Sequence, residues 1–270
     1  MSSLDASLVR RSLTAETRSR LDELEVFGSV ASTNTYLMSQ TAPAAGRFRV
    51  AIADHQTSGR GRHHRRWVSP PGAGLYMSFA YSFEEPPEQL PSLTLAIGVG
   101  VIAALHKLNV DGVSLKWPND IVALDGKLGG ILTELQSRAT EGVTVVTGIG
   151  LNIDLPEDAE TRIESDWARR IVDVASICDS VPGRATIAAA VVDELCSVMR
   201  KFAALGFVGF AEAWANHDWL RQREIIVDLP DQQISGAAAG VDNDGALLVE
   251  TGGAKIRVVS GSIILAGLNG

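Results

Sequence analysis

Hydrophobic and polar residues follow two different periods along the first 222 residues, and these periods predict both strands and helices. Residues 48–54 alternate as a strand does, and residues 74–83 have the same character. From 93 to 108 apolar residues recur instead at helical spacing, and Pro91 stands where a first-turn proline is favoured. Similar patterns predict further helices at 14–24, 34–41, 184–205 and 207–217, and further strands at 113–117, 128–136 and 143–153.

Two stretches between these elements are irregular. Residues 55–72 form a long polar segment rich in Gly, Arg and His, which we expect to be a loop, and residues 154–169 are acidic. A loop as long as the first one is usually functional or disordered in a compact domain. Because strands and helices are interleaved without regular βαβ alternation, the pattern favours an α+β fold over a doubly wound sheet.

The pattern changes from residue 223 onwards. Short strands are expected at 224–229, 232–241, 246–251, 254–259 and 262–265, separated by turn sequences such as DNDG and TGG. Closely spaced short strands of this kind are typical of a small β-barrel. We therefore predict two domains, at 1–222 and 223–270.

The composition is that of a globular protein. Of the 270 residues, 46% are hydrophobic and 21% are charged, and the longest mainly apolar run, 93–105, is too short to cross a bilayer. No apolar stretch follows the first arginines, so we expect no secretory signal. Cys178 and Cys196 match no metal spacing and are expected to be free thiols in a reducing compartment, the cytoplasm.

The net charge is −8, and this bears on nucleic-acid binding. Proteins that bind nucleic acid usually carry a basic surface, because neutralising phosphates supplies much of the affinity. This chain has no such excess of basic residues. Its single basic run, residues 60–66, is therefore more informative than it would be in a basic protein.

The segment 58–67, SGRGRHHRRW, is the strongest local signal for chemistry. Its glycines allow close approach of the backbone to an anion, and its four arginines match phosphate or carboxylate geometry. Trp67 offers an apolar face for a planar ring. The segment alone is compatible with a loop over a phosphorylated ligand, with a nucleic-acid contact, and with a plain solvated surface.

The segment 116–120, KWPND, is the second signal. Trp-Pro ends a strand sharply, which displays Asn119 and Asp120 at the strand end. The Asp-Gly pair at 125–126 predicts a hairpin that returns Lys127 beside them. Spacing alone also allows Lys127 to be an ordinary solvated lysine in a turn.

Three further segments are ambiguous when each is taken alone. The glycines of GIGLN at 148–152 imply close approach to the backbone, and the STN block at 32–34 could be a helix N-cap. Gln56 carries no signal by itself. His63 and His64 lack metal-ligand partners at suitable spacing, and the chain has no P-loop, Rossmann or G-x-S-x-G motif.

Taken together, STN, HQTSGRGR, KWPNDI, GKLGGILTE and GIGLN resemble the biotin–protein ligase family in order and spacing, from about Val26 to the C-terminus. The resemblance implies a central mixed sheet flanked by helices, as in class II synthetases, with a C-terminal SH3-like barrel. It implies that biotin and ATP are substrates, that Mg²⁺ is required, and that the partner is a biotin carboxyl carrier protein domain. No specific nucleic-acid or membrane partner and no metal-ligating residues are expected.

The resemblance also implies roles for individual residues. Lys127 and Arg62 would be catalytic. The biotin-binding residues would be Ser32, Thr33, Asn34, Gln56, Gly59, Arg60, Gly61, Arg62 and Lys127, and the ATP- or adenylate-binding residues would be Arg62, Trp67, Asn119, Asp120 and Asn152.

The sequence departs from the family pattern at one place. The family loop commonly reads GRGRxGRxW, and His64 stands here at its last glycine. Only 31 residues precede Ser32, too few for the DNA-binding domain of some members, so we expect a short form without repressor activity. A lipoate–protein ligase is the nearest rival, and KWPND favours biotin over it.

Overall fold

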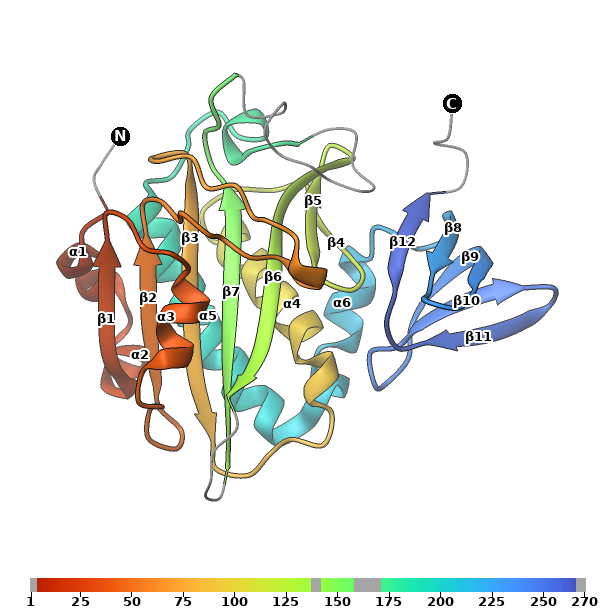
Figure 1. The fold of residues 1–270 in the computed structure, drawn as a ribbon, viewed down its shortest axis with the longest axis horizontal. Coiled ribbons are helices and arrows are strands. Elements are labelled where there is room, and N and C mark those ends of the chain that lie inside the picture. The colour runs from red at the N-terminus through yellow and green to blue at the C-terminus, as the bar shows by residue number, and fades with distance from the viewer. Residues whose placement is uncertain (1–3, 137–141, 158–170, 266–270) are drawn as a thin grey trace.

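The computed structural model describes residues 4–136, 142–157 and 171–265. A seven-stranded sheet in the order β1-β2-β3-β7-β6-β5-β4 forms the centre of the molecule (Figure 1). β1 and β2 are parallel and the other neighbours are antiparallel, so the sheet is mixed as predicted. Its strands are β1 Leu21–Phe27, β2 Phe48–Ala53, β3 Gly74–Phe83, β4 Val113–Lys116, β5 Asp120–Ala123, β6 Gly126–Gln136 and β7 Val143–Asn152.

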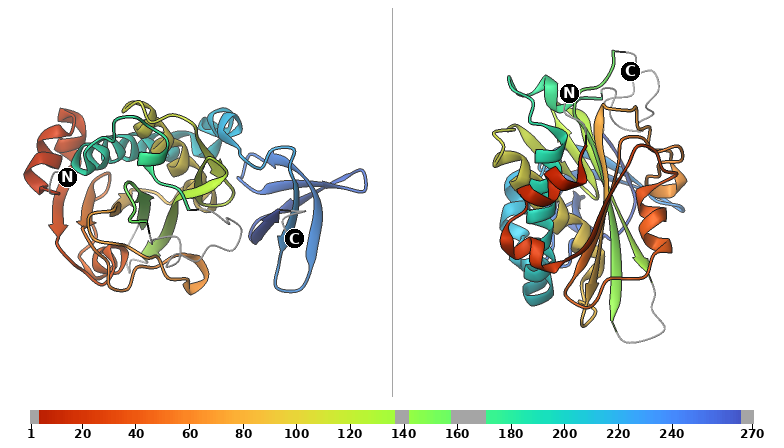
Figure 2. Two further views of the ribbon diagram at one scale, coloured as in Figure 1. Left: turned by 90° about the horizontal axis from the view of Figure 1, so that it is seen from above. Right: turned by 90° about the vertical axis from the view of Figure 1, so that its left-hand side faces the viewer.

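Helices cover both faces of this sheet (Figure 2). The helix α4 (Leu93–His106) is buried almost all round, because it lies between the sheet and α5 (Arg184–Leu205). Small residues permit both contacts: a Cβ on Gly98 would lie 3.0 Å from Leu115 of β4, and one on Gly100 would lie 2.6 Å from Val198 of α5. The same side carries α1 (Ala6–Ser12), α2 (Ala15–Arg20) and α6 (Ala211–His217).

The opposite face carries a short helix, α3 (Thr33–Ser39), which packs on β2, β3 and β7. Ser32 caps this helix, and its hydroxyl accepts from the Thr35 amide at 3.4 Å. The loop 55–72 passes over the same face and contains one 3₁₀ turn, Arg62–His64. This face therefore has room for a cavity beside α3.

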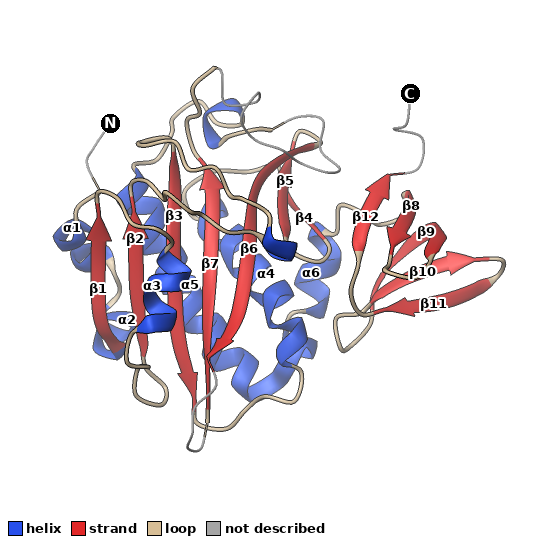
Figure 3. Cartoon of the chain, in the orientation of Figure 1, coloured by secondary structure: helices blue, strands red, loops and turns tan. Residues whose placement is uncertain are grey.

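The C-terminal part is a separate five-stranded antiparallel sheet, drawn at the right of Figure 3, in the order β11-β10-β9-β8-β12. Its strands are β8 Glu224–Asp228, β9 Gln233–Val241, β10 Leu247–Thr251, β11 Ala254–Val258 and β12 Ser262–Leu265. Within the described residues β11 and β12 do not pair, so the predicted barrel is not closed. The Trp117 indole N–H donates to the Gly245 carbonyl at 3.0 Å and joins this sheet to the main one.

Some predicted elements need correction. The helix predicted at 14–24 ends at Arg20, and the chain continues as β1, because Leu21 and Leu24 are buried where β1 pairs with β2. The helix predicted at 207–217 is divided into a 3₁₀ turn, Gly206–Gly209, and α6. The short strand β5 was not predicted. The acidic stretch predicted as irregular lies largely outside the described residues.

No helix in the described part of the chain has both the length and the apolar composition of a membrane span.

Candidate active site

A cavity of about 360 Å³ lies on the α3 face of the central sheet, under the loop 55–72. Residues from five sequence blocks line it, together with the β8 and β12 edge of the C-terminal sheet. The structure thus brings together almost every predicted site residue: Ser32, Thr33, Asn34, Gln56, Arg60, Gly61, Arg62, Trp67, Asn119, Asp120, Lys127 and Asn152. Gly59 is not in the cavity wall.

One end of the cavity is built from neutral polar side chains that hold one another. Gln56 Oε1 accepts from the Thr33 backbone amide at 2.9 Å and from the Thr33 hydroxyl at 3.2 Å. The Ser78 hydroxyl bridges to Thr33 Oγ1 at 2.7 Å and to Asn34 Oδ1 at 2.5 Å. Thr33, Asn34 and Ser78 are all buried. Such a fixed network of donors and acceptors suits an uncharged polar ligand group.

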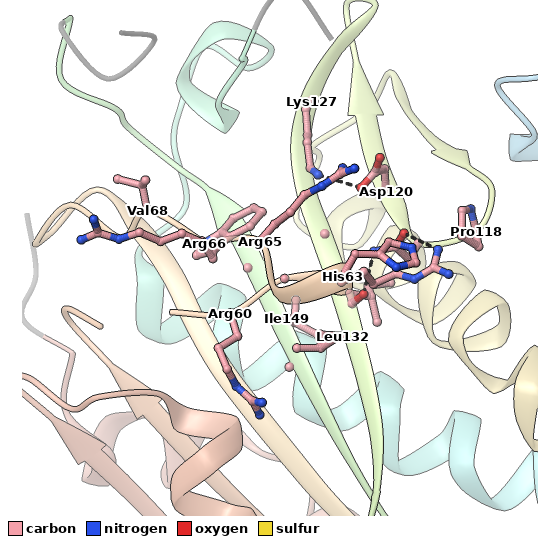
Figure 4. Close-up of a pocket in the computed structure, with 18 of the residues that line it drawn as sticks. Arg60, His63, Arg65, Arg66, Val68, Pro118, Asp120, Lys127, Leu132 and Ile149 are labelled. Atoms are coloured by element: carbon pink, nitrogen blue, oxygen red, sulfur yellow. Dashed lines mark hydrogen bonds and ion pairs between the residues drawn. The ribbon is translucent and has the colours of Figure 1, made fainter. Parts of the chain in front are cut away.

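The other end is cationic (Figure 4). The Lys127 ammonium lies 2.8 Å from Asp120 Oδ1, as the hairpin predicted, and the Lys116 ammonium lies 3.8 Å from Asp120 Oδ2. Arg62 donates to Asn119 Oδ1 at 3.4 Å, and Asn119 is itself held by the Ile131 carbonyl at 2.9 Å. Three cations around one carboxylate leave an excess of positive charge, which suits a phosphate group.

Lys116 is a site residue that the sequence interpretation did not single out. Its side chain is only 3% exposed, and burial lowers its pKa to about 8. The Asp120 carboxylate opposes this decrease, while Lys127 and Arg62 add to it. Burial also lowers the pKa of Arg62, and Asp120 again opposes it. The sequence signal that could have identified Lys116 is its position directly before Trp117, which is buried.

The Trp67 ring lies close against two glycines of the neighbouring strands. A Cβ on Gly150 of β7 would lie 2.5 Å from the Trp67 ring, and one on Gly130 of β6 would lie 3.5 Å from it. The close approach predicted for GIGLN is thus made by protein side chains, since a Cβ on Gly148 would also lie 2.5 Å from Asn34. The Trp67 indole N–H is buried and has no hydrogen-bond partner among the residues that the structure describes, and a ligand in the cavity could accept from it.

The basic loop is folded back on itself. The Gly61 amide donates to the Arg65 carbonyl at 2.8 Å, and the Trp67 amide donates to the Gly59 carbonyl at 2.9 Å. A Cβ on Gly59 would lie 2.5 Å from the Trp67 carbonyl oxygen, so this glycine permits the fold of the loop from outside the cavity. The left-handed residue of the turn is His63, with φ 53°, so a glycine at position 64 is not required for a positive φ.

Both ends of the loop are tied to the main sheet and to α5. Asp54 Oδ1 accepts from the Gly72 amide at 3.2 Å and from Arg184 at 2.5 Å. His55 Nδ1 lies 2.6 Å from the Ser69 carbonyl. These contacts close the base of the loop and fix where it crosses the cavity.

Asn152 holds two backbone segments together. Its amide donates to the Lys127 carbonyl at 3.3 Å and to the Val172 carbonyl at 3.0 Å. Lys127 is therefore fixed from its backbone as well as from its ammonium. Within the described residues, no cluster of three or more His, Cys, Asp or Glu side chains could hold a metal ion.

The fold and the cavity assign this chain to the class of the biotin and lipoate protein ligases. A profile of the "Biotin/lipoate A/B protein ligase family" matches residues 26–152, and one of the "Biotin protein ligase C terminal domain" matches residues 223–266. The chain is 33% identical over 234 residues to the "Bifunctional ligase/repressor BirA" of Escherichia coli. The alignment covers 87% of this chain and 71% of that protein. The chain belongs to the biotin protein ligase family.

Two further relatives are similar over most of their length. The "Biotin--[acetyl-CoA-carboxylase] ligase" of Mycobacterium tuberculosis is 31% identical over 252 residues, with 90% of this chain and 88% of that protein covered. A solved structure, "Biotin protein ligase from Aquifex aeolicus in complex with biotin and ATP", superposes with a TM-score of 0.73 at 27% identity. That superposition covers 90% of this chain and 98% of the other.

Proposed function

We propose that this chain activates biotin with ATP to biotinyl-5'-AMP and pyrophosphate, and then transfers biotin to a lysine of a biotin carboxyl carrier protein domain. The observation that carries the proposal is one cavity with a neutral polar end and a cationic end. The buried Thr33, Asn34 and Gln56 network suits the uncharged ureido ring of biotin. The Lys116, Lys127 and Arg62 cluster suits the phosphates.

The residues divide between two tasks. Ser32, with Arg60 and Gly61 of the loop, completes the biotin side, and Gly59 supports it from outside the cavity by permitting the fold of the loop. Trp67, Asn119, Asp120 and Asn152 form the nucleotide side, where the indole offers a face and an N–H to the adenylate. Residues 1–222 form the catalytic domain and 223–270 the C-terminal domain.

In the first step an oxygen of the biotin carboxylate attacks the α-phosphorus of ATP, and the bond to pyrophosphate breaks. Two anions must approach each other, so a preorganised positive field lowers the barrier. Lys127 and Arg62 supply that field, and Asp120 and Asn119 hold them in position. Mg²⁺ enters with ATP as part of that substrate.

In the second step the amine of the carrier lysine, after losing a proton, attacks the carbonyl carbon of the mixed anhydride. An amide forms and AMP leaves. The loop 55–72 covers the cavity between the two steps and excludes water from the reactive anhydride.

The direct test is incubation of the purified chain with biotin, ATP and Mg²⁺, followed by mass spectrometry for biotinyl-adenylate. Addition of a carrier domain should then convert the adenylate into AMP and a biotinylated lysine. The proposal is wrong if pyrophosphate release does not depend on biotin.

A further inference from the structure

The first arginine of the basic loop does not point at the cationic end of the cavity. Figure 4 shows the Arg60 side chain extending away from Lys127 and Asp120. Its guanidinium lies instead 2.6 Å from Glu134 Oε2, on a strand 74 residues further along the chain. An ion pair between Arg60 and Glu134 therefore links the loop to β6.

The same carboxylate oxygen is also bound from inside the cavity wall. Asn34 donates to Glu134 Oε2 at 2.9 Å and to the Leu132 carbonyl at 3.2 Å. Asn34 is 3% exposed and is further held by the Ser78 hydroxyl. Glu134 thus connects a fixed residue of α3 to the loop, although it is not itself in the cavity wall.

The position of Arg60 bears on the rest of the loop. Arg60 and Arg66 face each other in an isolated antiparallel bridge, and Arg62 lies between them in the chain. Holding Arg60 therefore holds the segment 60–66, which forms one wall of the cavity. If this tie is lost, the segment has fewer contacts to keep it closed.

We propose that Glu134 is a positioning residue that latches the segment 60–66 over the cavity, so that retention of biotinyl-adenylate depends on its negative charge. The adenylate part of this inference rests on the proposed function, whereas the latch itself does not. Because the Glu134 side chain is 26% exposed and that of Arg60 is 43% exposed, solvent weakens the pair. The expected effect is about twofold to fivefold on loop opening.

Trypsin offers a measurement on the protein without ligand, because it cleaves after the arginines of the loop itself. When opening is fast, the cleavage rate follows the open population. Glu134→Gln keeps an acceptor for Asn34 and removes only the charge, so cleavage within 60–66 should become about twofold to fivefold faster. Glu250→Gln, which breaks the exposed pair with Lys255 on the C-terminal sheet, is the matched control and should leave the rate unchanged.

Arg60 variants test the same contact from the side of the loop, where the fold is little at risk. Arg60→Gln should open the loop as much as Glu134→Gln does, and Arg60→Lys should restore slow opening. Opening is followed through cleavage at the other arginines of the segment. The double variant with both Gln substitutions should be no faster than the faster single one, because the two residues act through one contact.

The dissociation rate of biotinyl-adenylate, measured by a chase with unlabelled biotin and ATP, should rise in Glu134→Gln by a similar factor. At saturating substrates the rate of adenylate formation should change less than the dissociation rate. The latch is refuted if cleavage in Glu134→Gln equals that of the wild type, or if the two single effects multiply in the double variant. A wild-type protein that forms no biotinyl-adenylate would instead refute the proposed function, and the cleavage rates would still decide the latch.

Discussion

Replacing Lys127 with Met removes the ammonium at the cationic end of the cavity but keeps most of the aliphatic stem. The ammonium lies 2.8 Å from Asp120 and 5.8 Å from the centre of the Trp67 ring. Removing one preorganised charge of this kind costs about 3–4 kcal/mol in the transition state, so formation of the adenylate should slow by about 10²–10³-fold.

The effect on folding should be much smaller. A hydrogen bond to a charged group contributes about 1.5–3 kcal/mol, and here Lys116 remains 3.8 Å from Asp120 to offset part of the loss. We expect a decrease of about 1–2 kcal/mol in the free energy of unfolding, or a few degrees in Tm.

The assay is a single turnover of adenylate formation at saturating biotin and ATP, with thermal unfolding followed by circular dichroism. A folded Lys127→Met protein whose rate lies within threefold of the wild type would refute the reasoning. It would mean that Lys127 is an ordinary lysine of a hairpin turn.

Three other predictions concern neighbouring features. Arg62→Gly should release biotinyl-adenylate about ten- to 150-fold faster and label bystander proteins, since one charge-assisted contact of about 1.5–3 kcal/mol is lost; slower synthesis without leakage would limit Arg62 to the chemical step. Because the pKa of Lys116 is lowered to about 8, its charge is lost as pH rises through that value, so kcat/KM for ATP should decline there in the wild type. Lys116→Arg should move the decline to higher pH, and an unchanged profile would assign it to another group. In gel-shift assays the chain, with net charge −8, should form no salt-resistant, sequence-selective complex with DNA, and such a complex would refute the expectation that it has no repressor activity.

Helices and strands whose pattern is contained in the local sequence were predicted correctly. The strand Gly74–Phe83 and the helix Arg184–Leu205 have the predicted bounds, because the strand is one continuous, mainly apolar run that is buried throughout and the helix has a long apolar period. Residues 21–24, the first part of the strand Leu21–Phe27, were predicted as the end of a helix. The burial of this strand depends on the neighbouring β2, with which it pairs. Three of its seven residues are acidic, and its four apolar residues do not alternate in a way that marks one face of a strand.

The site was predictable as a set of residues but not as a set of contacts. The hairpin correctly placed Lys127 beside Asp120, since only a short turn separates them. The burial of Lys116 and the contact of Trp67 with Gly150 depend on segments far apart in the chain. No local pattern indicates such contacts, and the pairing of Arg60 with Glu134 belongs to the same group.

The measurement that tests the central claim most directly is ATP–pyrophosphate exchange by the purified chain, with biotin and with lipoate as alternative acids. Exchange monitors the first step alone, so no carrier protein is needed. We expect exchange that requires biotin and is absent with lipoate. Equal exchange with lipoate, or exchange without either acid, would contradict the account.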